Sequence, residues 1–186
     1  MHKLKQGFTL IELLVVVAII AILALIVLLA INPVEMARRS RDSRRMSDIG
    51  TMRRAIDLSL ADGGVLQGDP VTHYTATTAD GGNVLVADDA NNLAGLKIGK
   101  YLSVIPQDPM YKAGDATTLQ TITGVCPSGS VNTVAKQQMV YTFASDGSTY
   151  ELTAHLESTD NCAVPSGDGG NSDILYELGT TPGLTF

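Results

Sequence analysis

Tryptophan is absent from this 186-residue chain, and histidine and cysteine are scarce, with three and two residues. No two of the histidines, His2, His73 and His155, have the spacing of a metal-binding pair. The sequence also lacks a Gly-x-Ser-x-Gly nucleophile motif and a phosphate-binding loop. We place His73 in a loop, and His155 at the surface, on the polar face of a strand beside Glu151 and Glu157. We therefore expect that this protein is not an enzyme.

Because the chain has only two cysteines, Cys126 and Cys162, only one internal pairing is available. A bridge between them would close a loop of 37 residues, and such a loop contributes roughly 4 kcal/mol in the chain-entropy model. Paired cysteines are typical of oxidising compartments, so we expect this part of the chain to lie outside the cytoplasm. The alternative is two buried free thiols.

Arginine is missing after residue 54, and nine of the thirteen basic residues precede residue 63. Beyond residue 62, thirteen acids face four lysines, which gives a formal charge of about −9. An acidic domain rich in Gly, Thr, Asn and Asp favours solubility over binding to nucleic acid. The chain is therefore bipartite.

Residues 8–31 form an apolar run of 24 residues in which only Thr9 and Glu12 are polar. As a helix this run would be about 36 Å long, enough to cross a hydrocarbon core of roughly 30 Å. The run is too long for a secretory signal, and no small-x-small cleavage site follows it. A membrane span is the favoured interpretation, and a buried core helix is the alternative. A carboxylate such as Glu12 inside a span costs roughly 3 kcal/mol or more.

After the span, Asn32 is suited to cap a new helix, with Pro33 at its first position and Glu35 completing a capping box. One long helix kinked at Pro33 is the alternative. We assign residues 32–62 to an amphipathic helix. Its segment 35–45 is almost wholly polar and is expected to be an exposed neck, whereas an apolar stripe follows and should pack on a core: Met46, Ile49, Met52, Ile56 and Leu60.

Residues 63–186 are expected to form a globular head. Residues 63–92 are predicted to be a long loop, with a short strand at 83–87, and a short helix should end near Tyr101. Alternating residues on both sides of the turn at 145–148 predict a β-hairpin, and 173–178 predict a third strand. The predicted fold is α+β, with a long N-terminal helix packed on a small antiparallel sheet.

The N-terminus, MHKLKQ-GFTLIE, resembles the class III leader of type IV pilins and pseudopilins. The likeness rests on a short basic leader, Gly7, the aromatic Phe8, Glu12, and the apolar span that follows. It implies that residues 1–7 are a leader, that a prepilin peptidase cuts between Gly7 and Phe8, and that the new Phe8 amine is methylated. It also implies that the leader stays in the cytoplasm, which places everything after Ile31 on the outer side of the membrane.

The resemblance further implies a role for Glu12. Its carboxylate would pair with the Phe8 amine of a neighbouring subunit, because a buried acid needs a positive partner or a proton. A misplaced subunit would leave an unpaired charge, so the pair would set the axial register of a helical homopolymer. The alternatives are that Glu12 pairs with its own amine or is protonated in lipid.

Two features depart from this account. Lys3 and Lys5 precede the span while five arginines follow it shortly, so the positive-inside rule favours the opposite orientation. We give the cysteines and the leader motif more weight. Many members of the family also have a proline where Leu29 stands, whereas the nearest proline here is Pro33.

The basic segment ARRSRDSRR at 37–45 contains no aromatic residue for stacking on bases. We expect it to contact lipid headgroups and then acidic neighbours in a filament, and nucleic acid is not favoured. A C-terminal loop holds hard oxygen ligands suited to calcium, although the spacing is not that of an EF-hand. An ordinary solvated turn is the favoured alternative to this candidate set: Asp160, Asp168, Asn171 and Asp173.

The resemblance thus predicts a type IV pilin-like subunit, held in the cell membrane as a single-pass precursor and then assembled into a surface filament. Its implied partners are identical subunits, the prepilin peptidase, and a pilus assembly platform with its motor. Two alternatives stay open: a pseudopilin of a secretion system, and an anchored binding protein that does not polymerise.

Overall fold

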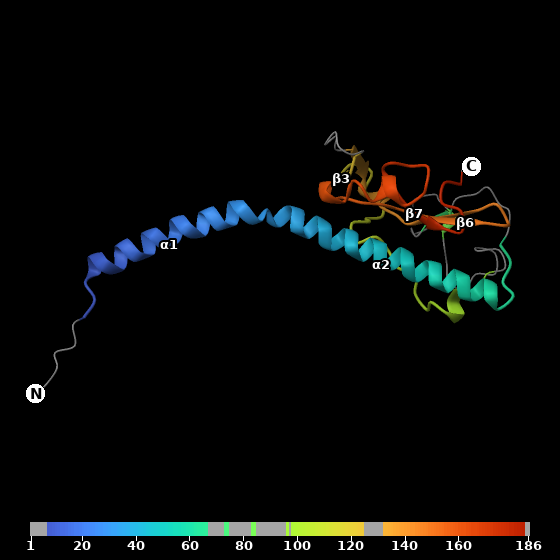
Figure 1. The fold of residues 1–186 in the computed structure, drawn as a ribbon, viewed down its shortest axis with the longest axis horizontal. Coiled ribbons are helices and arrows are strands. Elements are labelled where there is room, and N and C mark those ends of the chain that lie inside the picture. The colour runs from blue at the N-terminus through green and yellow to red at the C-terminus, as the bar shows by residue number, and fades with distance from the viewer. Residues whose placement is uncertain are drawn as a thin grey trace, which may run out of the picture. The chain divides into compact units, whose positions relative to one another are not determined.

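The computed structural model describes residues 7–66, 73–74, 83–84, 96, 98–124 and 132–184. The chain divides into two compact units, Met1–Ala37 and Arg38–Phe186, and the second is called the head unit below. The elements are two long helices followed by short strands and 3-10 turns (Figure 1). The predicted α+β class is confirmed.

Helix α1, Leu10–Ile31, ends at Asn32, whose φ of +45° is left-handed, a conformation that asparagine tolerates better than most residues. Helix α2, Pro33–Ala61, begins directly afterwards. The Asn32 side-chain and main-chain oxygens both accept a hydrogen bond from the Glu35 N–H, at 3.4 and 3.1 Å. Of the two arrangements that the sequence leaves open, the structure has the first, a new helix that begins at Pro33 and is capped by Asn32.

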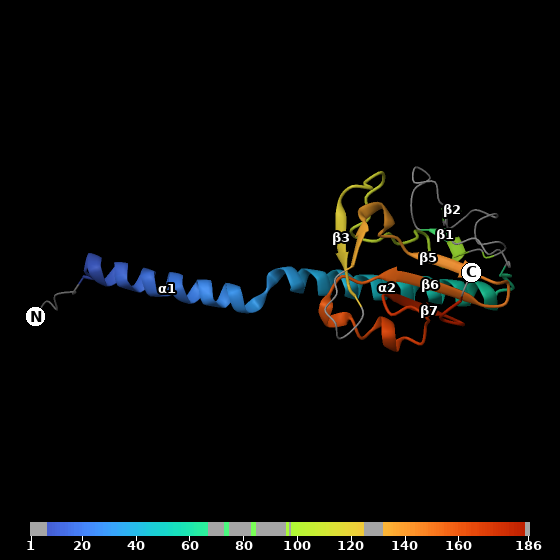
Figure 2. The same ribbon diagram turned by 90° about the horizontal axis from the view of Figure 1, so that it is seen from above.

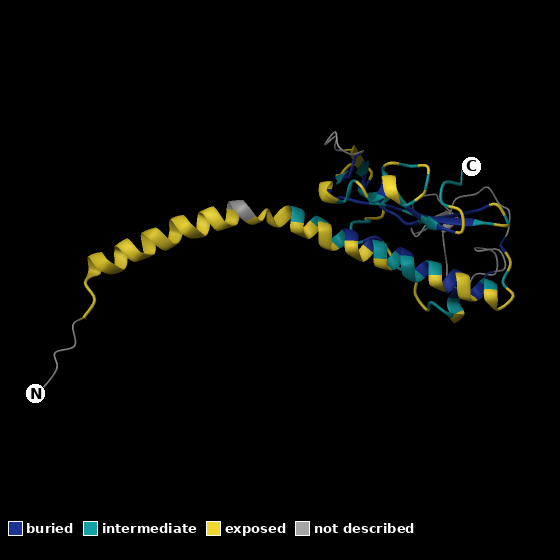
Figure 3. Cartoon of the chain, in the orientation of Figure 1, coloured by how far each residue is buried: buried dark blue, intermediate teal, exposed yellow. Residues whose placement is uncertain are grey.

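Helix α1 exposes every side chain that the structure describes in it (Figure 3). Leu10–Leu28 is long and apolar enough to cross a membrane. A helix that is apolar all round needs lipid or other helices around it.

The head unit is built on a five-stranded sheet of order β2-β1-β5-β6-β7 (Figure 2). All neighbours are antiparallel except β1 and β2. A separate two-stranded ladder pairs β3 with β4. The strands are β1 His73–Tyr74, β2 Asn83–Val84, β3 Leu119–Ile122, β4 Asn132–Ala135, β5 Thr142–Ser145, β6 Tyr150–His155 and β7 Leu175–Gly179.

Several strand predictions can be compared with this sheet. The β5–β6 hairpin, β7 and the short strand at Asn83–Val84 are confirmed. The turn between β5 and β6 is closed by Asp146, whose carboxylate accepts the N–H groups of Ser148 and Thr149 at 2.8 and 2.7 Å. His73 lies in β1 rather than in a loop, and the expected helix before Tyr101 is a single 3-10 turn, Ile98–Lys100.

Helix α2 covers one face of the sheet with its buried stripe (Figures 2 and 3). Ile49, Met52 and Ile56 are almost completely buried, as predicted, whereas Met46 and Leu60 are only partly buried. The stripe packs on apolar side chains from the strands and the segment before them: Tyr141, Phe143, Tyr150, Leu152 and Ala154.

Two tyrosines also tie the sheet to α2 through hydrogen bonds. The Tyr141 hydroxyl donates to Asp48 at 2.9 Å, and the Tyr150 hydroxyl donates to Asp57 at 2.5 Å. Burial and the neighbouring carboxylates raise the pKa of both tyrosines. The hydroxyls therefore stay protonated and keep donating at physiological pH.

Candidate functional site

The residues of the predicted cleavage site lie at an exposed, non-helical start of the described chain. Gly7 and Phe8 precede α1, and Phe8 is 85% exposed. A Cβ atom added at Gly7 would meet no described atom within 4 Å. The fold of this chain therefore does not itself require glycine there.

Glu12 forms a capping box with Thr9 at the start of α1. The Thr9 hydroxyl accepts the Glu12 N–H at 3.3 Å, while the Thr9 N–H and hydroxyl donate to Glu12 Oε2 at 2.9 and 2.7 Å. Two of the orphan donors at this helix start are satisfied in this way. Sequence reasoning identified Glu12 but missed Thr9 as its partner, although a Thr-x-x-Glu pattern signals such a box.

A second polar site lies in the head unit around Arg45, which is fully buried. Its guanidinium donates to both oxygens of Asp108, at 2.6 and 2.9 Å, and to Asp42 at 2.9 Å. It also lies 2.6 Å from Glu157 Oε1. Glu157 in turn accepts two hydrogen bonds from Arg41, at 2.9 and 2.5 Å. We call these five residues the Arg45 cluster.

The cluster joins segments that are far apart in the sequence. Asp42 lies three residues before Arg45 on α2, so the two side chains share a helix face. The Asp42 carboxylate also accepts the N–H groups of Glu157 and Ser158, both at 2.8 Å, and the Asn161 side-chain amide at 2.9 Å. One carboxylate thus fastens the segment after β6 to α2.

The Arg45 cluster corrects the expectation that residues 35–45 form an exposed neck. Asp42 and Arg45 are buried, Arg41 is half-buried, and Arg39 forms an ion pair with Asp160. The prediction was wrong because polar helical residues were taken as solvated, while their partners follow 63 to 119 residues later. Much of the basic segment expected to meet lipid headgroups therefore binds the head's own acids.

The charges in the cluster support one another. Burial alone would raise the pKa of Glu157, but hydrogen bonds from Arg41 and the nearby Arg45 outweigh it and hold the pKa below its usual value of 4.5. Burial disfavours the charge on Arg45, but its contacts with Asp108 and Glu157 outweigh that and raise its pKa. Arg41, Arg45 and Glu157 therefore stay ionised at neutral pH.

His155 also differs from its predicted surface position. Its Nδ1 is buried and has no hydrogen-bond partner in the described structure. Burial lowers the pKa of His155 below 6.5. The strand face beside it is covered, because Glu151 and Glu157 are buried too.

Three of the four calcium candidates have other partners in the structure. Asp160 pairs with Arg39, Asp168 accepts the N–H of Gly170, and the Asn171 side chain donates to the Gly183 carbonyl. Within the described ranges, no three His, Cys, Asp or Glu side chains are grouped so that they could hold a metal ion.

The structure describes one of the two cysteines of the predicted disulfide bridge. Cys162 follows a 3-10 turn, Thr159–Asn161, whereas Cys126 lies outside the described residues. The Cys126–Cys162 bridge therefore stays a prediction.

Residues 2–28 match the family model of the prokaryotic N-terminal methylation motif. This motif is the class III signal peptide of type IV pilins and pseudopilins, and the match includes Gly7, Phe8 and Glu12. Searches of curated proteins and of solved structures found no match. The match therefore concerns the N-terminal segment and not the head.

Replacing Arg45 with methionine should destabilise the head by about 3–5 kcal/mol, because three buried carboxylates lose their shared cation. Arg44→Met is the matched control. The Arg44 side chain is 66% exposed, and its ion pair with Asp48 is a long one, at 3.8 Å. Its loss should therefore change stability by less than about 0.5 kcal/mol. Urea unfolding of the full chain in detergent, followed by tyrosine fluorescence, measures both. Equal effects of the two substitutions would contradict the account.

As the pH falls, His155 and Glu157 should lower the head's free energy of unfolding over two separate pH ranges. The folded state holds His155 and Glu157 with lowered pKa values, so their stabilisation is complete above about pH 6.5 and 4.5 respectively. It is lost as pH falls through each folded pKa. Glu157→Gln should lower stability at pH 7 and flatten its decline below pH 4.5. An unaltered acid limb in unfolding curves recorded from pH 7 to pH 3 would refute the role given to Glu157.

Proposed function

We propose that this chain is the precursor of a type IV pilin-like filament subunit. The observation that carries the proposal is an exposed apolar helix with a single acid, Glu12, which begins beside an exposed Gly7–Phe8 bond within the matched motif. The mature subunit would be structural rather than catalytic.

Processing comes first in the proposed sequence of events. A prepilin peptidase hydrolyses the Gly7–Phe8 peptide bond, leaving a carboxylate on Gly7 and an amine on Phe8, which is then methylated. The geometry at Gly7 is consistent with this step. The fold leaves room for a side chain at this position, so the fold itself does not need glycine there. A requirement for glycine would then come from the enzyme that binds this segment.

Glu12 acts after this cleavage in the proposal. In the uncleaved chain its carboxylate is occupied by Thr9, which satisfies it without an opposite charge. Cleavage creates an ammonium one helical turn away, a stronger partner than a neutral donor. Pairing with the amine of a neighbouring subunit would then set the register of parallel α1 helices, since an unpaired charge in a dry core costs several kcal/mol.

The apolar helix would serve in two surroundings. Before assembly, α1 lies in the cell membrane as a single span with the head outside; afterwards, α1 helices of identical subunits bundle into the filament core. Both surroundings cover the apolar surface that α1 exposes on all sides. An assembly platform and its motor would move the subunit from one to the other.

Glu12→Ala should abolish filaments while Gly7–Phe8 cleavage continues, because the acid is needed only after processing. Glu35→Ala is the control, since Glu35 is an acid outside the apolar run. Electron microscopy of the sheared fraction and the mass of the membrane-bound chain report the two steps separately. Normal filaments from the Glu12→Ala strain would rule out the assembly role.

We also propose that Cys126 and Cys162 are bridged in the exported head. Native protein treated with iodoacetamide without reductant should carry no added mass at either cysteine, whereas prior reduction should allow two additions. The same experiment on a Cys126→Ser variant provides the control, because Cys162 then lacks its partner. Alkylation of both cysteines in the unreduced wild type would refute the bridge.

A further inference from the structure

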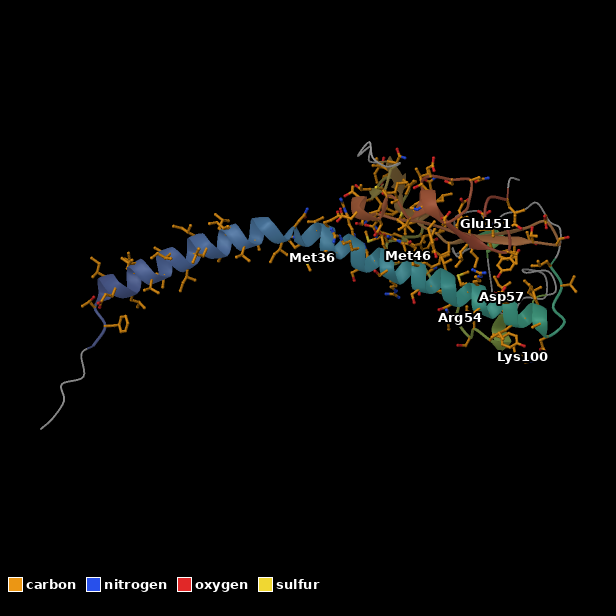
Figure 4. All side chains as sticks on the ribbon, in the orientation of Figure 1. Met36, Met46, Arg54, Asp57, Lys100 and Glu151 are labelled. Carbon is orange, nitrogen blue, oxygen red and sulfur yellow. The ribbon has the colours of Figure 1, made fainter. Side chains whose placement is uncertain are left out.

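Two buried acids lie on adjacent strands of the sheet, outside every site described so far. Glu151 on β6 is 4% exposed and Glu177 on β7 is 2% exposed. In the β6–β7 pairing, Glu177 lies opposite Thr153, which is two residues after Glu151 on β6. The two acids are therefore diagonal neighbours on one face of the sheet. Figure 4 places Glu151 in the sheet and Asp57 and Arg54 on α2.

The two acids lie on the sheet face opposite α2. Tyr150, Leu152 and Ala154 belong to the core against α2, and side chains alternate along a strand. Glu151 therefore belongs to the other face. Its neighbours across the sheet are the uncharged Ala144 on β5 and Gly179 on β7.

Main-chain donors from two other segments cover the acids. Glu151 Oε2 accepts the N–H groups of Gly183 and Leu184 at 2.8 and 2.6 Å. Glu177 Oε2 accepts the Ser172 N–H at 2.9 Å. We call residues 168–172 the β7-flanking loop and residues 180–184 the C-terminal turn. The acids connect both segments to the sheet.

No cation balances this pair in the described structure, where neither acid forms an ion pair. Asp168, which accepts the Glu177 N–H at 2.7 Å, is a further acid beside the pair. His155 lies further along β6 on the same face, and because burial lowers its pKa it supplies no positive charge at neutral pH. The C-terminal turn has no ionisable side chain. Two adjacent carboxylates without a cation cannot easily both be ionised.

The positions of the two acids leave little room to separate. A Cβ atom at Gly170 would lie 1.7 Å from Glu177 Oε2, so the glycine is required by the close approach of that carboxylate. Gly183, which donates to Glu151, has a φ of +90°, a conformation that favours glycine. Repulsion would therefore move the covering segments rather than the carboxylates alone.

We propose that Glu151 and Glu177 share one proton and that its loss releases the C-terminal turn and the β7-flanking loop from the sheet. Geometry carries this inference: two buried carboxyl groups on the same face of neighbouring strands, each held by main-chain donors, with no ion-pair partner in the described structure. Burial and the hydrogen bond with Glu177 also raise the pKa of Glu151 to about 7. The device is independent of filament assembly.

The direction of the pH effect follows from the raised pKa. The closed form binds the proton more tightly than the open form, in which Glu151 has a value near 4.5. The stabilisation is complete below pH 4.5 and is lost as the pH rises through about 7. Between these values the open population should grow by up to about tenfold for each pH unit, and then level off.

Amide hydrogen exchange of the full chain in detergent micelles, measured by NMR, tests this proposal. Protection factors for Ser172, Gly183 and Leu184, corrected for intrinsic exchange, should fall by about tenfold per unit from pH 5 to pH 7. The protection factors of β5 amides, such as that of Phe143, should not show this fall with pH. Glu151→Gln should remove the pH dependence, because a neutral amide has no proton to lose.

Asp173→Asn is the matched control, since Asp173 is an exposed acid close to the same loop, and it should leave the dependence unchanged. If Glu151→Gln fails to fold, Glu177→Gln should weaken the pH dependence, because the pKa of Glu151 is then raised by burial alone. Wild-type protection that is independent of pH over this range would overturn the proposal. So would a Glu151→Gln or Glu177→Gln variant that folds and keeps the wild-type dependence.

Discussion

Arg45 is fully buried, and its guanidinium contacts Asp42, Asp108 and Glu157, which come from three separate segments of the head. A buried cation without these partners would be costly, and so would each carboxylate without the cation. The path of the chain before Met110 and after β6 therefore depends on the same interaction. The apolar stripe of α2 supplies burial, whereas the Arg45 cluster specifies which segments pack beside it.

The same constraint, that a carboxylate removed from water needs a partner, is met in three ways along this chain. The Arg45 cluster uses arginines. Glu151 and Glu177 have only main-chain donors and each other, so we infer a shared proton. Glu12 has Thr9 in the uncleaved chain, and we propose that it gains an ammonium after processing. The Arg45 cluster is stable at neutral pH, and the Glu151–Glu177 pair responds to pH. Glu12 changes its partner only after the peptide bond before Phe8 is cleaved.

What the sequence could predict was local. Asn32 and Pro33 marked a helix boundary, Asp146 and Gly147 a hairpin turn, and the Gly7–Glu12 segment a linear motif, because each signal depends on neighbouring residues. The inward orientation of Arg45 and the burial of the His155 Nδ1 atom were not predictable in this way. Arg45 is distinguished from the exposed Arg44 only by partners at Asp108 and Glu157. Sequence spacing placed Glu151 on a polar strand face, but not the C-terminal turn that covers it.

The central claim is that this chain is processed, exported and assembled through α1. The most direct measurement is the intact mass, with N-terminal peptide mapping, of the protein in the fraction sheared from the cell surface. The account predicts a chain that begins at methylated Phe8 in that fraction. The same processed chain found only in the membrane would favour a secretion pseudopilin over a displayed filament. A sheared or membrane-bound chain that still begins at Met1 would contradict the account, because Glu12 would then never meet a new amine.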